Sequence, residues 1–176
     1  DLDRVVRRIY LEVRLPMVCD ADALNALSRD PDGVPMSAGP RILTPHPGEF
    51  DRLTGAKAGG DREQLAIELA ASRQAVVVLK GHRTLITDGK RWQRNETGNP
   101  GMATAGAGDV LTGVITALLC QGLSPWDAAR LGAHVHGLAG DCAAKRLSMV
   151  SMTAGDIVHA LPEAWQQIHH QGATPA

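Results

Sequence analysis

Residues 75–80 read AVVVLK and carry the strongest strand signal in the chain. A continuous run of β-branched residues is typical of a strand buried on both faces, as in a parallel sheet. Before it, Asp61 with Gln64 three residues later resembles a capping box and predicts a helix to about residue 73. After it, two short strand-like runs flank Asp88 and Gly89, which predicts a β-hairpin with a tight turn.

Strands and helices continue to alternate on both sides of this centre. Residues 17–20 and 41–44 read as short buried strands, and Asp22 is a plausible N-cap for a short helix after the first of them. Further helices are expected over 5–13, 47–53 (with Gly55 as its stop), 110–119 (closed by Gly122), from Ser124 and from about Thr153, with a frayed tail over 169–176. Such alternation predicts an α/β fold with a mainly parallel sheet and an added hairpin.

The composition narrows the class of protein. The chain has 176 residues and a net charge of −1, which favours one domain and argues against nucleic acid or an anionic membrane as the main partner. No apolar run approaches the roughly 20 residues of a membrane span, and the first residues do not resemble a secretory signal. Three scattered cysteines indicate a reducing, cytoplasmic setting and give no metal signature: Cys19, Cys120 and Cys142.

The first candidate site is the small-residue stretch GNPGMATAGAGD at 98–109, which runs into the predicted helix 110–119. A helix N-terminus binds anions, and Gly106, Ala107 and Gly108 have no bulky side chain to keep a phosphate away. We predict an anion hole there, with Asp109 at its rim as the base that takes a proton from a hydroxyl. A packed loop with an acidic helix cap explains these residues alone equally well.

A second candidate is TPHPGE at 44–49, directly after a predicted strand. Ligands collect at the carboxyl ends of parallel strands, so His46 and Glu49 could point into a crevice there. Glu49 could orient a hydrated Mg²⁺ ion, although a carboxylate that complements the start of a helix is the more common role.

A third candidate, KGHRT, also follows a strand, and it could line the phosphates or ribose of a nucleotide: Lys80, Gly81, His82, Arg83 and Thr84. Taken alone, this motif is more often a turn with a solvated lysine. On a later helix, His134 and His136 are two residues apart and point to different faces, so we interpret them as packing or interface residues and not as shared metal ligands.

Five segments occur together and in one order: DADALNAL, ILTPHPGEFDRLTG, VVVLKGHRTLI, the stretch from GNPGMAT to SPWDAA, and HGLAGD. Over about residues 20–161 this set resembles the ADP/ATP-dependent NAD(P)H-hydrate dehydratases of the ribokinase-like superfamily. The resemblance implies a three-layer α/β fold and a lyase that repairs hydrated NADH or NADPH. Such enzymes phosphorylate the hydrate hydroxyl with ADP or ATP, and phosphate then leaves. The resemblance also implies Mg²⁺ and a homo-oligomer, a tetramer in the family.

The resemblance assigns roles to residues at matching positions. Asp109 matches the family's catalytic acid and a contact to the hydrate, Gly108 matches a nucleotide contact, and His46 matches a contact to the hydrated dinucleotide. Residues 80–84 match the segment that holds AMP or ADP. Glu49 inherits a role with Mg²⁺ and phosphate from the Asn-x-x-Glu motif of related sugar kinases.

Two departures from the family pattern matter. The residues before Asp109 are AGAG where the family usually has GGMG, which should spare an anion hole made of backbone N–H groups. Family members also carry roughly another hundred residues first, so we expect residues 1–176 to be the C-terminal portion of a single domain that lacks the early strands. Two alternatives stay open: a kinase for a sugar or vitamin precursor, and a non-catalytic nucleotide-binding fragment that needs a companion chain.

Overall fold

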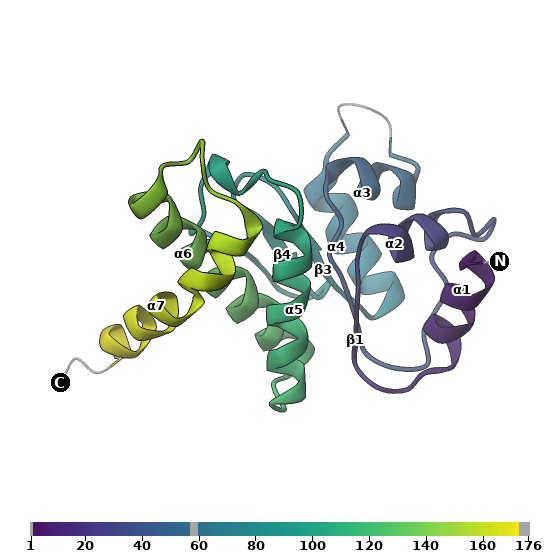
Figure 1. Ribbon diagram of the computed structural model, residues 1–176. Helices are drawn as coiled ribbons and strands as arrows, with labels where there is room; N and C mark the ends of the chain where they lie inside the picture. Colours follow the sequence, from purple (N-terminus) through teal and green to yellow (C-terminus); the bar gives the residue numbers. More distant parts are fainter. Residues whose placement is uncertain (1, 57–59, 173–176) are drawn as a thin grey trace.

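A five-stranded mixed sheet runs through the middle of the molecule (Figure 1). The computed structural model describes residues 2–56 and 60–172. The strands lie side by side in chain order: β1 (Met17–Cys19), β2 (Arg41–Leu43), β3 (Val76–Leu79), β4 (Leu85–Thr87) and β5 (Trp92–Arg94). The first three strands are parallel, whereas β3, β4 and β5 pair antiparallel. The three predicted strands and the hairpin are therefore confirmed, although β1 is only partly buried whereas β2 and β3 are fully buried.

Helices cover both faces of the sheet and make it the middle of three layers (Figure 1). One face, with Ile42, Val76 and Val78, packs on α5 and α6. The other, with Leu43, Val77 and Leu85, packs on the first four helices, and α7 lies against α6. The helices are α1 (Leu2–Glu12), α2 (Ala21–Ser28), α3 (Pro47–Thr54), α4 (Arg62–Arg73), α5 (Ala107–Cys120), α6 (Pro125–Leu147) and α7 (Ala154–Gly172), with a 3₁₀ turn η1 (Pro100–Met102).

Most predicted helix ends are confirmed. Ser124 caps α6, Asp61 caps α4, and Gly55 ends α3 in the left-handed region that glycine adopts without strain. The prediction for Asp22 was wrong, because the N-cap is Asp20, two residues earlier, and Asp22 lies inside the first turn of α2. Gln64 does not complete a capping box either, since its amide donates to Glu68.

The C-terminal tail was predicted to be frayed, and no membrane-spanning helix was predicted. The predicted frayed tail lies partly in α7, which extends to residue 172, while residues 173–176 lie outside the described part. Within 2–56 and 60–172, none of the helices is long and apolar enough to cross a membrane.

Arg41 connects α1 to β2 of the sheet. Its side chain is almost fully buried at the start of β2, and its guanidinium donates hydrogen bonds to four backbone carbonyls, those of Tyr10, Val13, Leu15 and Pro40. The carbonyls of Tyr10, Val13 and Leu15 lie at the end of α1 and in the loop beyond it, where the helix leaves acceptors without an internal partner, and Pro40 directly precedes Arg41. The buried arginine therefore has a structural role, because it holds the end of α1 against β2, far from the cavity described below.

Candidate functional site

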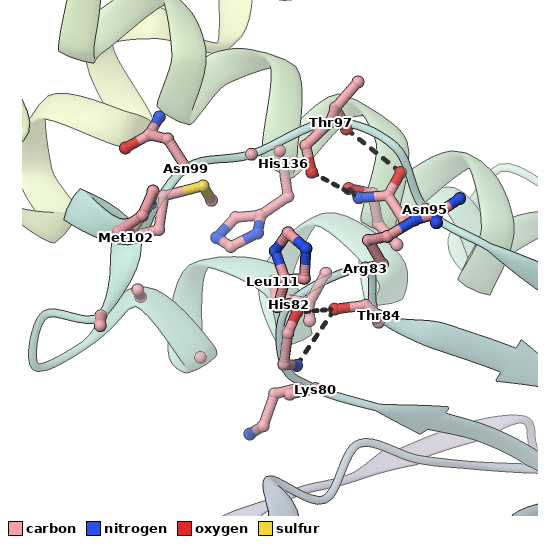
Figure 2. Close-up of a pocket in the computed structure, with 18 of the residues that line it drawn as sticks. Lys80, His82, Arg83, Thr84, Asn95, Thr97, Asn99, Met102, Leu111 and His136 are labelled. Carbon is pink, nitrogen blue, oxygen red and sulfur yellow. Dashed lines mark hydrogen bonds between the residues drawn. The ribbon is translucent and has the colours of Figure 1, made fainter. Parts of the chain in front are cut away.

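A cavity of about 920 Å³ opens where the carboxyl ends of β2 and β3 meet the N-terminus of α5 (Figure 2). Its size is that of pockets that hold cofactors and nucleotides. The side chains that line it come from five segments: His46 and Pro47; Lys80, Gly81, His82, Arg83 and Thr84; Asn95 and 97–100 with 102–104; Ala107, Gly108 and Leu111; and Ala133, His136 and Gly137, with Met149 at the edge.

A partly buried ion pair lies at one end of the cavity. The Nζ atom of Lys80 donates to Oδ1 of Asp20 at 2.7 Å, and Oε2 of Glu49 lies 3.9 Å from the same Nζ. Thr112 on α5 donates to the other oxygen of Asp20 at 3.2 Å. One ammonium group therefore sits between two carboxylates. Sequence reasoning did not single out Asp20 as a site residue, although an acid at the end of a predicted strand is the signal that points to it.

The N-terminus of α5 lies directly against this ion pair. A Cβ at Gly108 would lie 3.3 Å from Oδ2 of Asp20 and 3.4 Å from Nζ of Lys80, so a larger residue would push on both partners. Gly106 precedes the helix with a φ of +86°, a conformation that strains residues other than glycine. The alanines at 105 and 107, where the family usually has Gly and Met, do not change Gly106, the residue whose backbone conformation requires glycine.

Two backbone N–H groups are available at the start of α5. The amide of Ala107 donates to the carbonyl of Thr104, and that of Val110 donates to Gly106. Between them, Gly108 and Asp109 have no acceptor for their amides in the part of the chain that the structure describes. These orphan donors and the helix dipole form an anion-binding end. The side chain of Asp109 is exposed and lies outside the residues that line the cavity.

His46 and Glu49 form the start of α3. Nδ1 of His46 accepts hydrogen bonds from the amides of Gly48 (3.0 Å) and Glu49 (3.3 Å), and Oε2 of Glu49 accepts from the amide of His46 (2.8 Å). Glu49 therefore stabilises the start of a helix, which is the more common role that the sequence analysis named for it, and His46 takes part in the same cap. His46 also lines the cavity, while the carboxylate of Glu49 is buried behind it.

The KGHRT segment forms a tight turn on the cavity wall (Figure 2). The amide of Gly81 donates to Oγ1 of Thr84 (3.3 Å), which in turn donates to the carbonyl of Gly81 (3.1 Å). Arg83 turns outward far enough to pair with Glu96. All five residues from Lys80 to Thr84 line the cavity, so the turn presents both backbone and side chains to a ligand.

The opposite wall is the segment 95–102, which lies along α6. Four hydrogen bonds tie it to that helix: Asn95 to the carbonyl of Ala133 (3.2 Å), Thr97 to the carbonyl of His134 (2.8 Å), and the amide of Gly98 and the side chain of Asn99 to Asp141 (2.9 Å each). Gly137 and Gly140 allow this close approach, because a Cβ at either would lie 2.3 Å from Thr97 or Met102. Sequence reasoning did not identify this wall.

The two histidines of α6 have different surroundings. His134 is half-buried and does not line the cavity, whereas His136 is 9% exposed and points into it (Figure 2). Burial lowers the pKa of His136 to about 4, and the charge of Lys80 adds to this, while a hydrogen bond with the backbone of Ala107 opposes it. The interpretation as a packing residue is therefore incomplete for His136.

Residues 3–163 match the model of a family described as NAD(P)H-hydrate dehydratase. A bifunctional NAD(P)H-hydrate repair enzyme from Moorella thermoacetica is 48% identical over 97% of this chain and 33% of its own length. An ADP-dependent (S)-NAD(P)H-hydrate dehydratase from Neisseria meningitidis is 43% identical over 82% of this chain and 51% of its own length. This chain therefore spans about a third to a half of these relatives.

The solved structures give the same result for the fold. An ADP/ATP-dependent NAD(P)H-hydrate dehydratase from Bacillus subtilis, co-crystallised with ATP and Mg²⁺, matches with a TM-score of 0.79 and 36% identity. The match covers 89% of this chain and 56% of the Bacillus chain. The expected ribokinase-like α/β fold is confirmed.

Proposed function

Because the chain belongs to the NAD(P)H-hydrate dehydratase family, we propose that the protein carrying it is an ADP-dependent (S)-NAD(P)H-hydrate dehydratase. ADP would phosphorylate the hydroxyl of hydrated NADH or NADPH, and elimination of phosphate would regenerate the dihydronicotinamide, with AMP as the second product. Phosphate is a far better leaving group than water, so the transfer makes the elimination feasible. The carrying observation is a nucleotide-sized cavity that ends at two free amides beside an exposed carboxylate.

ADP would bind in this cavity in one direction. Its terminal phosphate belongs at the amides of Gly108 and Asp109, where the helix dipole favours negative charge. Lys80 lies beside the same helix turn and supplies a cation, already oriented by Asp20. The nucleoside would then lie along the KGHRT turn and the apolar side chains of Leu111 and Met102.

Asp109 would act on the second substrate. Because its carboxylate is outside the cavity and next to the phosphate end, a hydroxyl approaching from the open side would meet it. We assign it the removal of the hydroxyl proton as the phosphoryl group is transferred. His46, which is half-exposed at the cavity edge, would contact the hydrated dinucleotide.

The donor set suits Mg²⁺ better than a tightly enclosed metal. Within 2–56 and 60–172 there is no group of three or more His, Cys, Asp or Glu residues that could hold an ion. Mg²⁺ needs only one or two carboxylates and completes its shell with water and substrate phosphate. Glu49, close to Lys80 and Asp20, is the residue we propose to face it, and the ion would offset phosphate charge.

The proposal also includes the domain organisation, the cellular location and the oligomeric state. Residues 1–176 would form one unit, the C-terminal portion of a ribokinase-like domain. The protein would work in the cytoplasm as a homo-oligomer, a tetramer by family resemblance. Sedimentation of the purified protein measures the last of these, and a monomer at working concentration would contradict it.

The deciding experiment incubates the protein with hydrated NADH, ADP and Mg²⁺ and measures dihydronicotinamide absorbance, AMP and phosphate. Equal amounts of all three products support the dehydratase. A stable phosphorylated product would instead identify a kinase, and ADP binding without turnover would identify a non-catalytic fragment. Asp109→Asn should abolish turnover with ADP affinity unchanged, whereas Asp22→Asn, the same change in the exposed first turn of α2, should have no effect on turnover.

Lys80 can be tested in the same assay. Lys80→Ala removes the cation at the phosphate end and leaves the carboxylate of Asp20 without its partner, so the Kd for ADP should rise by about tenfold or more. Lys90→Ala, at an exposed lysine of the hairpin turn, is the matched control and should bind ADP normally. Equal affinities of the two variants would remove Lys80 from the nucleotide site.

A further inference from the structure

His136 carries a polar atom that the protein does not use. Its side chain lies on α6 and points into the cavity that Met102 and His82 also line (Figure 2). Its Nε2 atom is buried and has no hydrogen-bond partner among the residues that the structure describes. Buried polar atoms are normally paired, so an orphan that faces a cavity indicates a group supplied from outside the chain.

The other side of the ring determines what Nε2 can do. The backbone of Ala107 favours the protonated ring, which is the effect of a carbonyl that accepts a hydrogen bond. A neutral imidazole carries a single proton, and we place it on Nδ1, which leaves the buried Nε2 atom without one. Burial keeps the ring neutral. Nε2 is consequently a hydrogen-bond acceptor.

An acceptor at this position discriminates between the two halves of a nucleotide. A lone pair repels phosphate oxygens, which carry negative charge, whereas it attracts an N–H or O–H group. Apolar residues line part of the same cavity, among them Leu111, Met102 and Ala133. These surroundings suit a base and a sugar better than they suit charged phosphates.

We propose that Nε2 of His136 accepts a hydrogen bond from the nucleoside half of ADP, either from the amino group of the base or from a ribose hydroxyl. His136 is thereby a residue that determines nucleotide specificity. This proposal rests on the proposed function in one respect, namely that the nucleotide is ADP. If the donor is the amino group, a base with an oxo group at that position is rejected, because two acceptors would face each other.

The test measures the Kd of ADP, inosine diphosphate, 2′-deoxy-ADP and 3′-deoxy-ADP by calorimetry, for the wild-type protein and for His136→Leu. His136→Leu should weaken ADP binding about tenfold, whereas the one analogue that lacks the donor should lose no affinity from the same change. The identity of that analogue shows whether the donor is the base or the sugar. His134→Leu, the same change on the same helix outside the cavity, should bind ADP normally, and His136→Gln, which keeps an acceptor, should restore part of the affinity.

Several outcomes would overturn the proposal. A loss in His136→Leu that is the same factor for ADP and all three analogues would show a structural effect, and an unchanged Kd for ADP would show no contact. Circular dichroism of each variant confirms that it is folded before binding is measured. If the wild-type protein itself does not bind ADP, the proposed function fails. That result differs from one in which the wild-type protein binds ADP but His136→Leu binds it equally well, which contradicts only the role of His136.

Discussion

A single methyl group added at Gly137 should loosen the cavity wall formed by residues 95–99. In Gly137→Ala the new Cβ would lie 2.3 Å from Oγ1 of Thr97 and 2.7 Å from its carbonyl carbon and oxygen. Favourable carbon contacts are about 3.5–4.0 Å, so the segment must move away from α6 by roughly 1 Å. The carbonyl is backbone, and it cannot turn aside as a flexible side chain would.

The magnitude follows from three contributions. Overpacking of this kind costs about 1–3 kcal/mol. Movement of the segment also weakens its four hydrogen bonds to α6, each worth about 1 kcal/mol when intact. Alanine is favoured over glycine in a helix by about 1 kcal/mol, which offsets part of the loss. We expect a net loss of about 2 kcal/mol and a decrease in Tm of about 4–8 °C.

The assay is urea and thermal unfolding followed by circular dichroism, with Gly113→Ala as the control. Gly113 is a helical glycine on α5 with open space where its Cβ would be, so that variant should gain up to about 1 kcal/mol. Gly137→Ala should also bind ADP more weakly, because the displaced segment lines the cavity. If both variants show the same stability, the close approach at Gly137 does not hold the wall in place.

Two other perturbations test the structure away from this contact. Arg41→Met should lower the free energy of unfolding by about 3 kcal/mol in urea titrations, since four backbone carbonyls lose a hydrogen bond from a buried guanidinium. A loss under about 1 kcal/mol would contradict this role of Arg41. The pKa of His136 is about 4 in the folded protein, whereas it is about 6.5 in the unfolded chain. As the pH falls below about 6.5, the unfolded chain therefore binds a proton that the folded protein does not, and this favours unfolding. Stability should therefore decline by about 3 kcal/mol between pH 6.5 and pH 4 from this residue, and a His136→Gln variant that keeps the same pH slope would refute that assignment.

The sequence alone determined those features that depend on neighbours along the chain. The β-branched run before Lys80, the turn at Asp88 and Gly89 and the cap at Ser124 each involve residues a few positions apart. Local conformational preference is sufficient for these, and they were predicted correctly. The family was also identified from the sequence, because its motifs are contiguous stretches.

Tertiary structure alone decided how distant residues meet in the cavity. Asp20 and Lys80 are 60 positions apart and pair only because β1, β2 and β3 are parallel and end at the same edge. The wall at 95–99 depends on a helix more than thirty residues later, which has no side chain at Gly137. Helical periodicity separates His134 from His136 but does not say which one faces the cavity. That depends on how α6 packs against the sheet and α5, which is a property of the whole core.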